Sequence, residues 1–164
     1  MRARAPADPY VLALGWLARR ELTAFQIRQR LGARQVPSGT IDEVVGRLRR
    51  SGALDDRRTA LAFARTAVVV KRHGRHRVLR QLEAIGIDRA LAHRAVGEVF
   101  ESLDEQALLD QALARRLGRT RRIGTDPAER RRLYAYLVRQ GFDASAVSAR
   151  LRARFRRSPD QNDD

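Results

Sequence analysis

Apolar residues recur every three or four positions along nearly the whole chain. The stretches from Ile41 to Leu48 and from Ala60 to Ala67 both place apolar residues at positions i, i+3, i+4 and i+7, which puts them on one face of an α-helix. The β-branched run from Val68 to Val70 continues the second of these faces, so it indicates the end of a helix rather than a strand. The spacing therefore predicts an all-α chain of about nine helices, each roughly 10 to 18 residues long.

Capping residues and glycines indicate where these helices begin and end. Thr23 with Gln26, and Thr40 with Glu43, have the spacing of a capping box, in which two side chains satisfy free amides of the first turn. The segment from Asp126 to Glu129, with a proline at its second position, predicts a third helix start. Six glycines are expected to close helices in the left-handed conformation. They are Gly32, Gly52, Gly74, Gly86, Gly118 and Gly141.

A short pattern repeats along the chain. The segment from Leu82 to Asp88 reads Leu-x3-Gly-Ile-Asp, and the segment from Leu137 to Asp143 repeats it 55 residues later as Leu-x3-Gly-Phe-Asp. A fainter copy begins at Leu31, 51 residues before Leu82, with Gln35 at the glycine position. A period of this length holds three helices and is typical of stacked helical repeats.

The period predicts the domain organisation. We expect an elongated or curved array of three tandem three-helix repeats, formed by residues 9–54, 55–102 and 103–157. Residues 1–8 and 158–164 lack periodicity and are expected to be disordered tails, of which the second is acidic.

The charge of the chain indicates a polyanionic partner. Lys and Arg number 34 against 19 Asp and Glu, which gives a net charge of +15. Such an excess attracts phosphate, so nucleic acid or a nucleoprotein is the expected partner. The alternative is a codon bias toward Arg, because Lys71 is the single lysine.

Cysteine usage and hydropathy bear on the compartment. Cysteine is absent, which excludes disulfides and thiolate chemistry and suits a cytoplasmic protein. Unbroken apolar runs such as Ala67 to Val70 are far below the length that a membrane span requires, so we expect no membrane association.

Catalytic and metal-binding patterns have little support. His73 and His76 lie among Arg residues, where cationic repulsion disfavours a metal, and these two histidines and His93 are expected at the surface or lining a groove. The carboxylate pairs Asp42-Glu43, Asp55-Asp56 and Asp104-Glu105 each precede or begin a predicted helix, where capping explains them. No nucleotide-binding or serine-hydrolase motif occurs. We therefore predict a protein that is not an enzyme and that uses no cofactor or metal.

The candidate binding residues are basic clusters near predicted helix ends. Arg side chains there can bind phosphate or carboxylate, and the sequence alone does not separate these partners. The alternative is that these clusters are a solvated surface, rich in Arg through codon bias, that binds no partner. The candidates are Lys71, Arg72, Arg75, Arg77 and Arg80 in the first cluster, Arg115, Arg116, Arg119, Arg121 and Arg122 in the second, and Arg130 in a third.

Two further features favour packing over recognition. The segment from Val78 to Val99 could form a helix-turn-helix with Arg89, His93 and Arg94 on its second helix, but any helical array generates this pattern. Trp16 and Phe25 are expected in the core rather than as platforms for bases.

Four motifs in order resemble the RecX family of bacterial regulatory proteins, over about residues 10 to 157. They are Ala18-Arg19-Arg20-Glu21-Leu22-Thr23 followed by Ile27 and Leu31; Gly52-Ala53-Leu54-Asp55-Asp56 with Ala60 and Phe63; Gly74-x3-Val78-x3-Leu82-x3-Gly86-Ile87; and Asp126-Pro127-x-Glu129 leading to Tyr136-Leu137-x3-Gly141-Phe142.

This resemblance implies a non-enzymatic modulator of the RecA recombinase, in recombination, DNA repair and the SOS response. Family members typically lodge in the groove of the RecA filament on single-stranded DNA and inhibit filament extension, ATP hydrolysis, strand exchange and co-protease activity. The implied partners are the RecA filament and single-stranded DNA, with double-stranded DNA second, and the chain is expected to act as a monomer. The alternatives are a DNA-binding regulator or nucleoid-type protein without a RecA partner, and a scaffold whose charge reflects codon drift.

Overall fold

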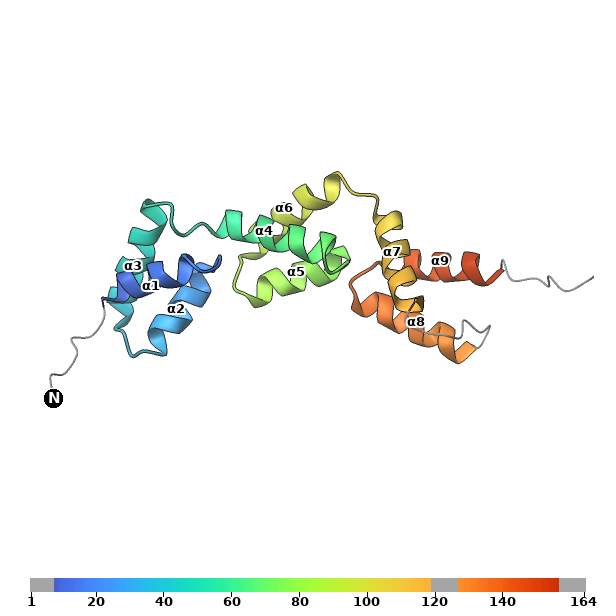
Figure 1. Ribbon diagram of the computed structural model, residues 1–164, viewed down its shortest axis with the longest axis horizontal. Coiled ribbons are helices and arrows are strands. Elements are labelled where there is room, and N and C mark those ends of the chain that lie inside the picture. The colour runs from blue at the N-terminus through green and yellow to red at the C-terminus, as the bar shows by residue number, and fades with distance from the viewer. Residues whose placement is uncertain (1–7, 119–126, 157–164) are drawn as a thin grey trace, which may run out of the picture. The chain divides into compact units, whose positions relative to one another are not determined.

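The computed structural model describes residues 8–118 and 127–156, and this part of the chain is helical throughout its regular structure (Figure 1). It contains nine α-helices and no strand, which confirms the all-α prediction. The helices have 9 to 14 residues, and all except the nine-residue α1 and α2 fall in the expected range of lengths. They are α1 (Pro9–Leu17), α2 (Ala24–Gly32), α3 (Ser38–Arg50), α4 (Asp56–Val69), α5 (Arg75–Ala84), α6 (Arg89–Glu101), α7 (Glu105–Leu117), α8 (Pro127–Arg139) and α9 (Ala144–Arg156).

The chain divides into two compact units, which we describe separately. The first comprises the chain up to Phe63 together with Gln81–Ala95, and the second comprises Ala64–Arg80 together with the chain from Val96 onward. The predicted repeats at 9–54, 55–102 and 103–157 each enclose three of the helices, and we retain these boundaries as a proposal. The predicted tails coincide with undescribed residues except for Asp8, whose side chain caps α1.

In the first unit, α1, α2 and α3 pack against one another. Ile27 and Leu31 of α2 meet Val45 and Leu48 of α3 in a core where all four side chains are almost fully buried. Spacings of three and four residues bring these apolar side chains to one face of each helix, as the sequence predicts.

In the second unit, α8 packs against both α7 and α9. An ion pair between Arg150 of α9 and Asp110 of α7 joins the two outer helices of this group. The buried side chains of these three helices include Leu109, Leu113, Leu133, Leu137, Val147 and Leu151. No helix in the described ranges has both the length and the apolar character that crossing a bilayer requires.

The three predicted helix starts have different outcomes in the structure. At α2 the capping box forms, with the Thr23 hydroxyl accepting from the Gln26 amide and the Gln26 side chain accepting from the Thr23 amide. Pro127 is the first residue of α8, whereas Asp126 lies outside the described residues. The prediction at Thr40 is wrong, because α3 begins at Ser38 and Pro37 caps it without a side-chain hydrogen bond.

Two of the three carboxylate pairs lie at helix starts as predicted. Asp55 and Asp104 accept backbone amides of the first turns of α4 and α7. Asp42-Glu43 instead lies inside α3, and Asp42 forms an ion pair with Arg28 of α2. Since α3 begins earlier than predicted, this pair cannot cap it.

The left-handed positions are partly those predicted. Gly52, Gly86 and Gly141 have φ angles of 72°, 81° and 95°. The prediction is wrong for Gly32, Gly74 and Gly118; Gly32 is still the last residue of α2, and Gly118 has a helical φ of −60°. After α2 and α4 the left-handed residues are Gln35 and Arg72, with φ angles of 61° and 58°.

The turn between the second and third helices is the same in all three copies of the sequence pattern. The amides of Val36, Ile87 and Phe142 donate to the carbonyls of Leu31, Leu82 and Leu137, at 3.2, 3.0 and 3.3 Å. In each copy the residue before this donor is left-handed: Gln35, Gly86 or Gly141. This geometry closes a helix by satisfying carbonyls of its last turn, so the repeated sequence pattern encodes a repeated turn.

The contacts made by these turns also repeat. In the first unit, the Thr23 hydroxyl donates to the Ile85 carbonyl at 2.6 Å, and Phe25 packs against Gly86. The second unit has corresponding contacts 51 and 55 residues further along, where the Gly74 amide donates to the Gln140 carbonyl at 2.8 Å. In both cases the start of the second helix of a predicted repeat contacts the turn that ends the second helix of the following repeat.

The two aromatic residues expected in the core are not fully buried. Phe25 is 43% exposed, because its ring covers Gly86 at the surface rather than entering the core. Trp16 is partly buried against the core, and the guanidinium groups of Arg30 and Arg34 lie over its ring, at 5.5 and 4.9 Å from the ring centroid.

Candidate nucleic-acid and protein-binding surface

The first basic cluster begins at the turn that follows α4. Arg72 adopts the left-handed conformation there, and the amides of Arg72 and His73 donate to the carbonyls of Val68 and Ala67, both at 3.1 Å. This turn directs the His73 side chain inward, where it is 7% exposed. The prediction of a surface or groove-lining histidine is therefore wrong for His73, whereas His76 and His93 are exposed.

The backbone of this segment is held by the turn between α8 and α9. The amides of Gly74 and His76 donate to the carbonyls of Gln140 and Gly141, at 2.8 and 3.1 Å. A Cβ atom at Gly74 would collide with the Gly141 backbone, so the two backbone segments lie closer together than any residue larger than glycine would permit. These hydrogen bonds fix the backbone from which the neighbouring basic side chains extend.

Two members of the first cluster have partners within the second unit. The Arg75 guanidinium pairs with Glu105 of α7, with Nη2 2.8 Å from Oε1, and lies 4.8 Å from the Phe100 ring centroid. Arg77 donates through Nη1 to Oε1 of Gln140 at 3.0 Å. These contacts reduce the conformational freedom of both side chains. Arg75 and Arg77 therefore help to hold the segment in place, in addition to contributing positive charge to the surface.

The other three members of the first cluster are Lys71, Arg72 and Arg80. Within the described part of the chain, their side chains form no ion pair or hydrogen bond. Lys71 and Arg80 are exposed, and Arg72 is partly so. Val69 and Val70, which the sequence predicts only as the end of a helix, directly precede Lys71 and Arg72 and have 57% and 63% of their surfaces exposed. Free cations and apolar side chains therefore share one turn.

The structure joins the second cluster to the first. Arg115 of α7 donates through Nη1 to the Val70 carbonyl at 3.2 Å, next to Lys71. Arg116 lies over the Tyr136 ring, at 5.3 Å from its centroid. We call Val69–Arg72, Arg75, Arg77, Arg80, Arg115 and Arg116 the basic surface. Arg119, Arg121 and Arg122 fall outside the described residues.

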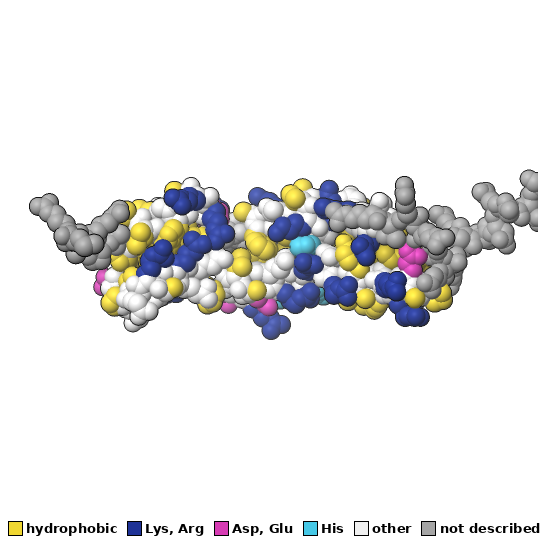
Figure 2. All heavy atoms as spheres, turned by 60° about the horizontal axis from the view of Figure 1, so that its bottom comes forward, with side chains coloured by type: hydrophobic (Ala, Val, Ile, Leu, Met, Phe, Trp, Pro, Cys, Tyr) yellow, Lys and Arg dark blue, Asp and Glu magenta, His cyan; other side chains and the backbone are white. Residues whose placement is uncertain are grey.

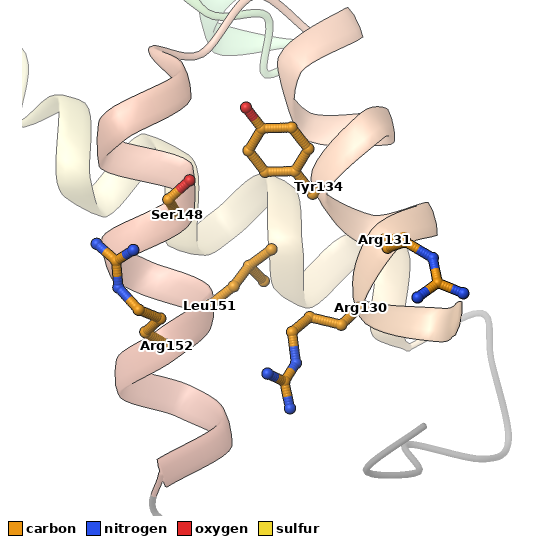
Figure 3. Close-up of a pocket in the computed structure, with 6 residues that line it drawn as sticks. All are labelled: Arg130, Arg131, Tyr134, Ser148, Leu151 and Arg152. Carbon is orange, nitrogen blue, oxygen red and sulfur yellow. The ribbon is translucent and has the colours of Figure 1, made fainter. Parts of the chain in front are cut away.

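Arg130 belongs to a different site in the same unit. Its guanidinium lies 4.9 Å from the Phe155 ring centroid, beside a cavity between α8 and α9. The cavity-lining residues Tyr134, Ser148 and Arg152 were missed by sequence reasoning (Figure 3). The only signal is the four-residue spacing from Arg130 to Tyr134 and from Ser148 to Arg152, which is common on exposed helix faces.

The space-filling view shows the character of this half of the chain. In the right-hand part of Figure 2, Lys and Arg side chains are far more frequent than Asp and Glu on the face that is drawn. In the described ranges no group of three or more His, Asp or Glu side chains could hold a metal ion. The chemistry of this surface is therefore that of hydrogen-bond donors and positive charge.

The helix-turn-helix connection is present, with α5 ending at Ala84 and α6 beginning at Arg89. On α6, Ala92 and Ala95 are buried, whereas Arg89, His93 and Arg94 are exposed. The turn of this motif is the one whose Gly86 contacts Phe25. Packing thus accounts for the motif, although its exposed cations add to the basic character of the chain.

Two family models match this chain. Residues 10–48 match the first three-helix domain of RecX, and residues 104–150 match its third three-helix domain. These segments cover most of α1 to α3 and most of α7 to α9, respectively.

Known proteins show the same relationship. A regulatory protein RecX from Halorhodospira halophila is 34% identical over 142 residues, covering 84% of this chain and 82% of the relative. A regulatory protein RecX from Geobacillus kaustophilus is 30% identical over 142 residues, and this match covers 87% of this chain but about half, 52%, of that longer relative.

A solved structure supports the fold. The crystal structure of RecX from Lactobacillus salivarius superposes with a TM-score of 0.70 at 18% identity, covering 92% of this chain and 96% of that one. The family models, the relatives and the repeated turns agree: the chain belongs to the RecX family of regulatory proteins.

Proposed function

We propose that this chain inhibits the RecA recombinase by binding the filament that RecA forms on single-stranded DNA. Bound there, it reduces filament extension, ATP hydrolysis, strand exchange and co-protease activity. It does so as a cytoplasmic monomer, by occupying a surface rather than by catalysis. Membership of the RecX family supports this proposal, as does the net charge of +15, which suits an anionic nucleoprotein.

The observation that carries the proposal is the set of unpaired cations on an anchored backbone. Lys71, Arg72 and Arg80 lie in a segment without acidic residues, and hydrogen bonds from Gly74 and His76 fix its backbone. Anchoring reduces the conformational entropy lost on binding, so a larger part of each contact energy contributes to affinity. The exposed Val69 and Val70 add apolar area, which favours a protein component in the partner.

The proposed partner contains both protein and DNA, and Arg side chains can bind both. Arg can bind carboxylate or phosphate through two parallel hydrogen bonds, so one surface can contact acidic protein and DNA backbone together. Several weak contacts made at once add to a strong one when the geometry lets them form together. A protein bound in this way blocks RecA subunits and DNA without needing a reactive group.

The test is RecA ATP hydrolysis on single-stranded DNA, titrated with this protein. Substituting Lys71, Arg72 and Arg80 together by Gln should weaken inhibition by about tenfold or more. The control replaces Arg19, Arg20 and Arg50, which are also exposed, by Gln and so removes the same charge elsewhere. It should weaken inhibition much less. Unchanged ATP hydrolysis at saturating wild-type protein would refute the proposal.

A second candidate function is direct DNA binding without RecA, which the net charge alone favours. Affinity for DNA should then fall steeply with salt, because each neutralised phosphate releases counterions. Equal loss of affinity in the two triple variants, with no effect of the protein on RecA, would favour this function over filament inhibition.

A further inference from the structure

The cavity between α8 and α9 has an apolar interior and a basic rim. Its volume is about 440 Å³, and it lies wholly within the second unit. Leu151 is buried at its base, and the Tyr134 ring, 37% exposed, lies across the space between the two helices (Figure 3). Arg130 of α8 lies at the other end, the Arg152 side chain extends along the outer side of α9 toward Ser148, and Arg131 points away from the cavity.

The polar groups around this cavity are mostly donors with no partner. None of the described residues that line it is acidic. Among the described residues, Arg131 and Arg152 form no ion pair, and the hydroxyls of Tyr134 and Ser148 form no hydrogen bond. Arg130 is positioned by its stacking on Phe155. The cavity therefore suits a ligand with a flat apolar part and anionic groups beside it.

We propose that this cavity binds an unstacked nucleobase of single-stranded DNA. The base lies against Tyr134 and Leu151, and the flanking phosphates pair with Arg130 and Arg152. An aromatic side chain beside cations is the arrangement by which proteins bind single strands without sequence preference. This inference rests on the proposed function only in its choice of a DNA partner, and it adds direct contact with a base.

The donor and acceptor inventory favours DNA over an acidic peptide. A phosphodiester strand carries acceptors but no donors along its backbone, so it matches a lining of guanidinium groups. A peptide brings an amide donor with nearly every residue, and among the described lining side chains only the hydroxyls of Tyr134 and Ser148 can accept. A duplex is also a poor ligand, since both faces of each base are stacked within it.

The experiment compares two fluorescent oligonucleotides of equal length at one salt concentration, without RecA. One is oligothymidylate and the other is an abasic strand with the same phosphates. Wild-type protein should bind the thymidylate strand about tenfold more tightly. Tyr134→Ala should abolish this preference without weakening abasic binding, and Tyr134→Phe should retain it. Arg152→Gln should weaken binding of both strands, more than Arg132→Gln, which removes an exposed charge outside the cavity lining on α8.

Three results would overturn the inference. Wild-type protein could bind both strands equally, or Tyr134→Ala could weaken both by the same factor. An acidic peptide containing leucine could bind in place of DNA and lose affinity in Tyr134→Ala, which would assign the cavity to a protein partner. Because RecA is absent, any of these results together with intact inhibition of RecA would reject the cavity assignment and leave the proposed function standing. Circular dichroism melting of each variant verifies its folding.

Discussion

Two glycines with the same left-handed backbone have different surroundings. Gly52, with φ of 72°, has no heavy atom within 4 Å of the position where a Cβ would lie. At Gly86, with φ of 81°, a Cβ would overlap the Cβ and ring of Phe25. The first position requires glycine for its backbone conformation alone, whereas the second also requires it for space.

Substitution by alanine should separate these two requirements. Gly52→Ala should lower the free energy of unfolding by about 1 kcal/mol, which is the cost of a left-handed L-residue. Gly86→Ala should lower it by roughly 2 to 4 kcal/mol, because overlap with Phe25 adds to that cost. Urea denaturation of both variants measures the difference. Equal losses would mean that the Phe25 contact moves aside without cost.

Individual residues also show where sequence reasoning succeeds. The Leu-x3-Gly pattern predicts the left-handed turns at Gly86 and Gly141, because glycine is strongly preferred there. Gln35 and Arg72 adopt the same conformation without being glycine, so a search for glycines alone does not find these two turns. The position of Phe25 depends on a contact with a residue 61 positions away, which periodicity cannot reveal.

At the scale of one helix, Asp143 is the group that starts α9. Its Oδ1 accepts the Ser145 hydroxyl and the amides of Ser145 and Ala146, the latter two at 2.9 Å. The Ser145 hydroxyl, followed by the Ala146 amide, lowers the pKa of Asp143 below the ordinary value of 3.8. A lowered carboxyl pKa stabilises the folded state above the unfolded pKa, and the effect disappears as pH falls through the folded pKa.

The cap of α9 should therefore be sensitive to acid. Asp143→Asn should have a lower melting temperature than wild type at pH 7, and the two proteins should converge as pH falls below the ordinary carboxyl range. Ser145→Ala removes the hydrogen bond that lowers the pKa of Asp143 most. In this variant the stabilisation that ionised Asp143 gives to the folded state should therefore disappear at a higher pH than in wild type. Melting curves between pH 7 and about pH 2 measure both effects. A pH-independent difference would contradict the assignment.

The helices themselves are more predictable than the partners of their side chains. All-α structure follows from apolar spacing, and the α2 start follows from Thr23 and Gln26. The similar pair Thr40 and Glu43 does not form a capping box, because α3 begins earlier, at Ser38. The basic clusters could be located, but the pairing of Arg75 with Glu105 could not, since those residues are brought together only when α7 packs in the second unit. The cavity between α8 and α9 likewise exists only after folding.

For the whole molecule, two electrostatic effects oppose each other. Ion pairs such as Arg28–Asp42, Arg75–Glu105 and Arg150–Asp110 favour folding, but their side chains are 38 to 63% exposed. Exposed pairs of this kind contribute at most about 1 kcal/mol each, and many contribute nothing measurable. The net charge of +15 instead causes repulsion throughout the folded chain. We expect repulsion to dominate.

Salt should therefore stabilise this protein. Raising NaCl from about 10 mM to about 300 mM shortens the screening length severalfold, so the melting temperature should rise by a few degrees as repulsion is screened. Replacing Lys71, Arg72 and Arg80 by Gln removes charges that have no carboxylate partner among the described residues. This variant should melt higher than wild type at low salt and respond less to added salt. Differential scanning calorimetry across the salt series measures both. A melting temperature that falls with salt would show that the ion pairs outweigh the repulsion and would contradict this prediction.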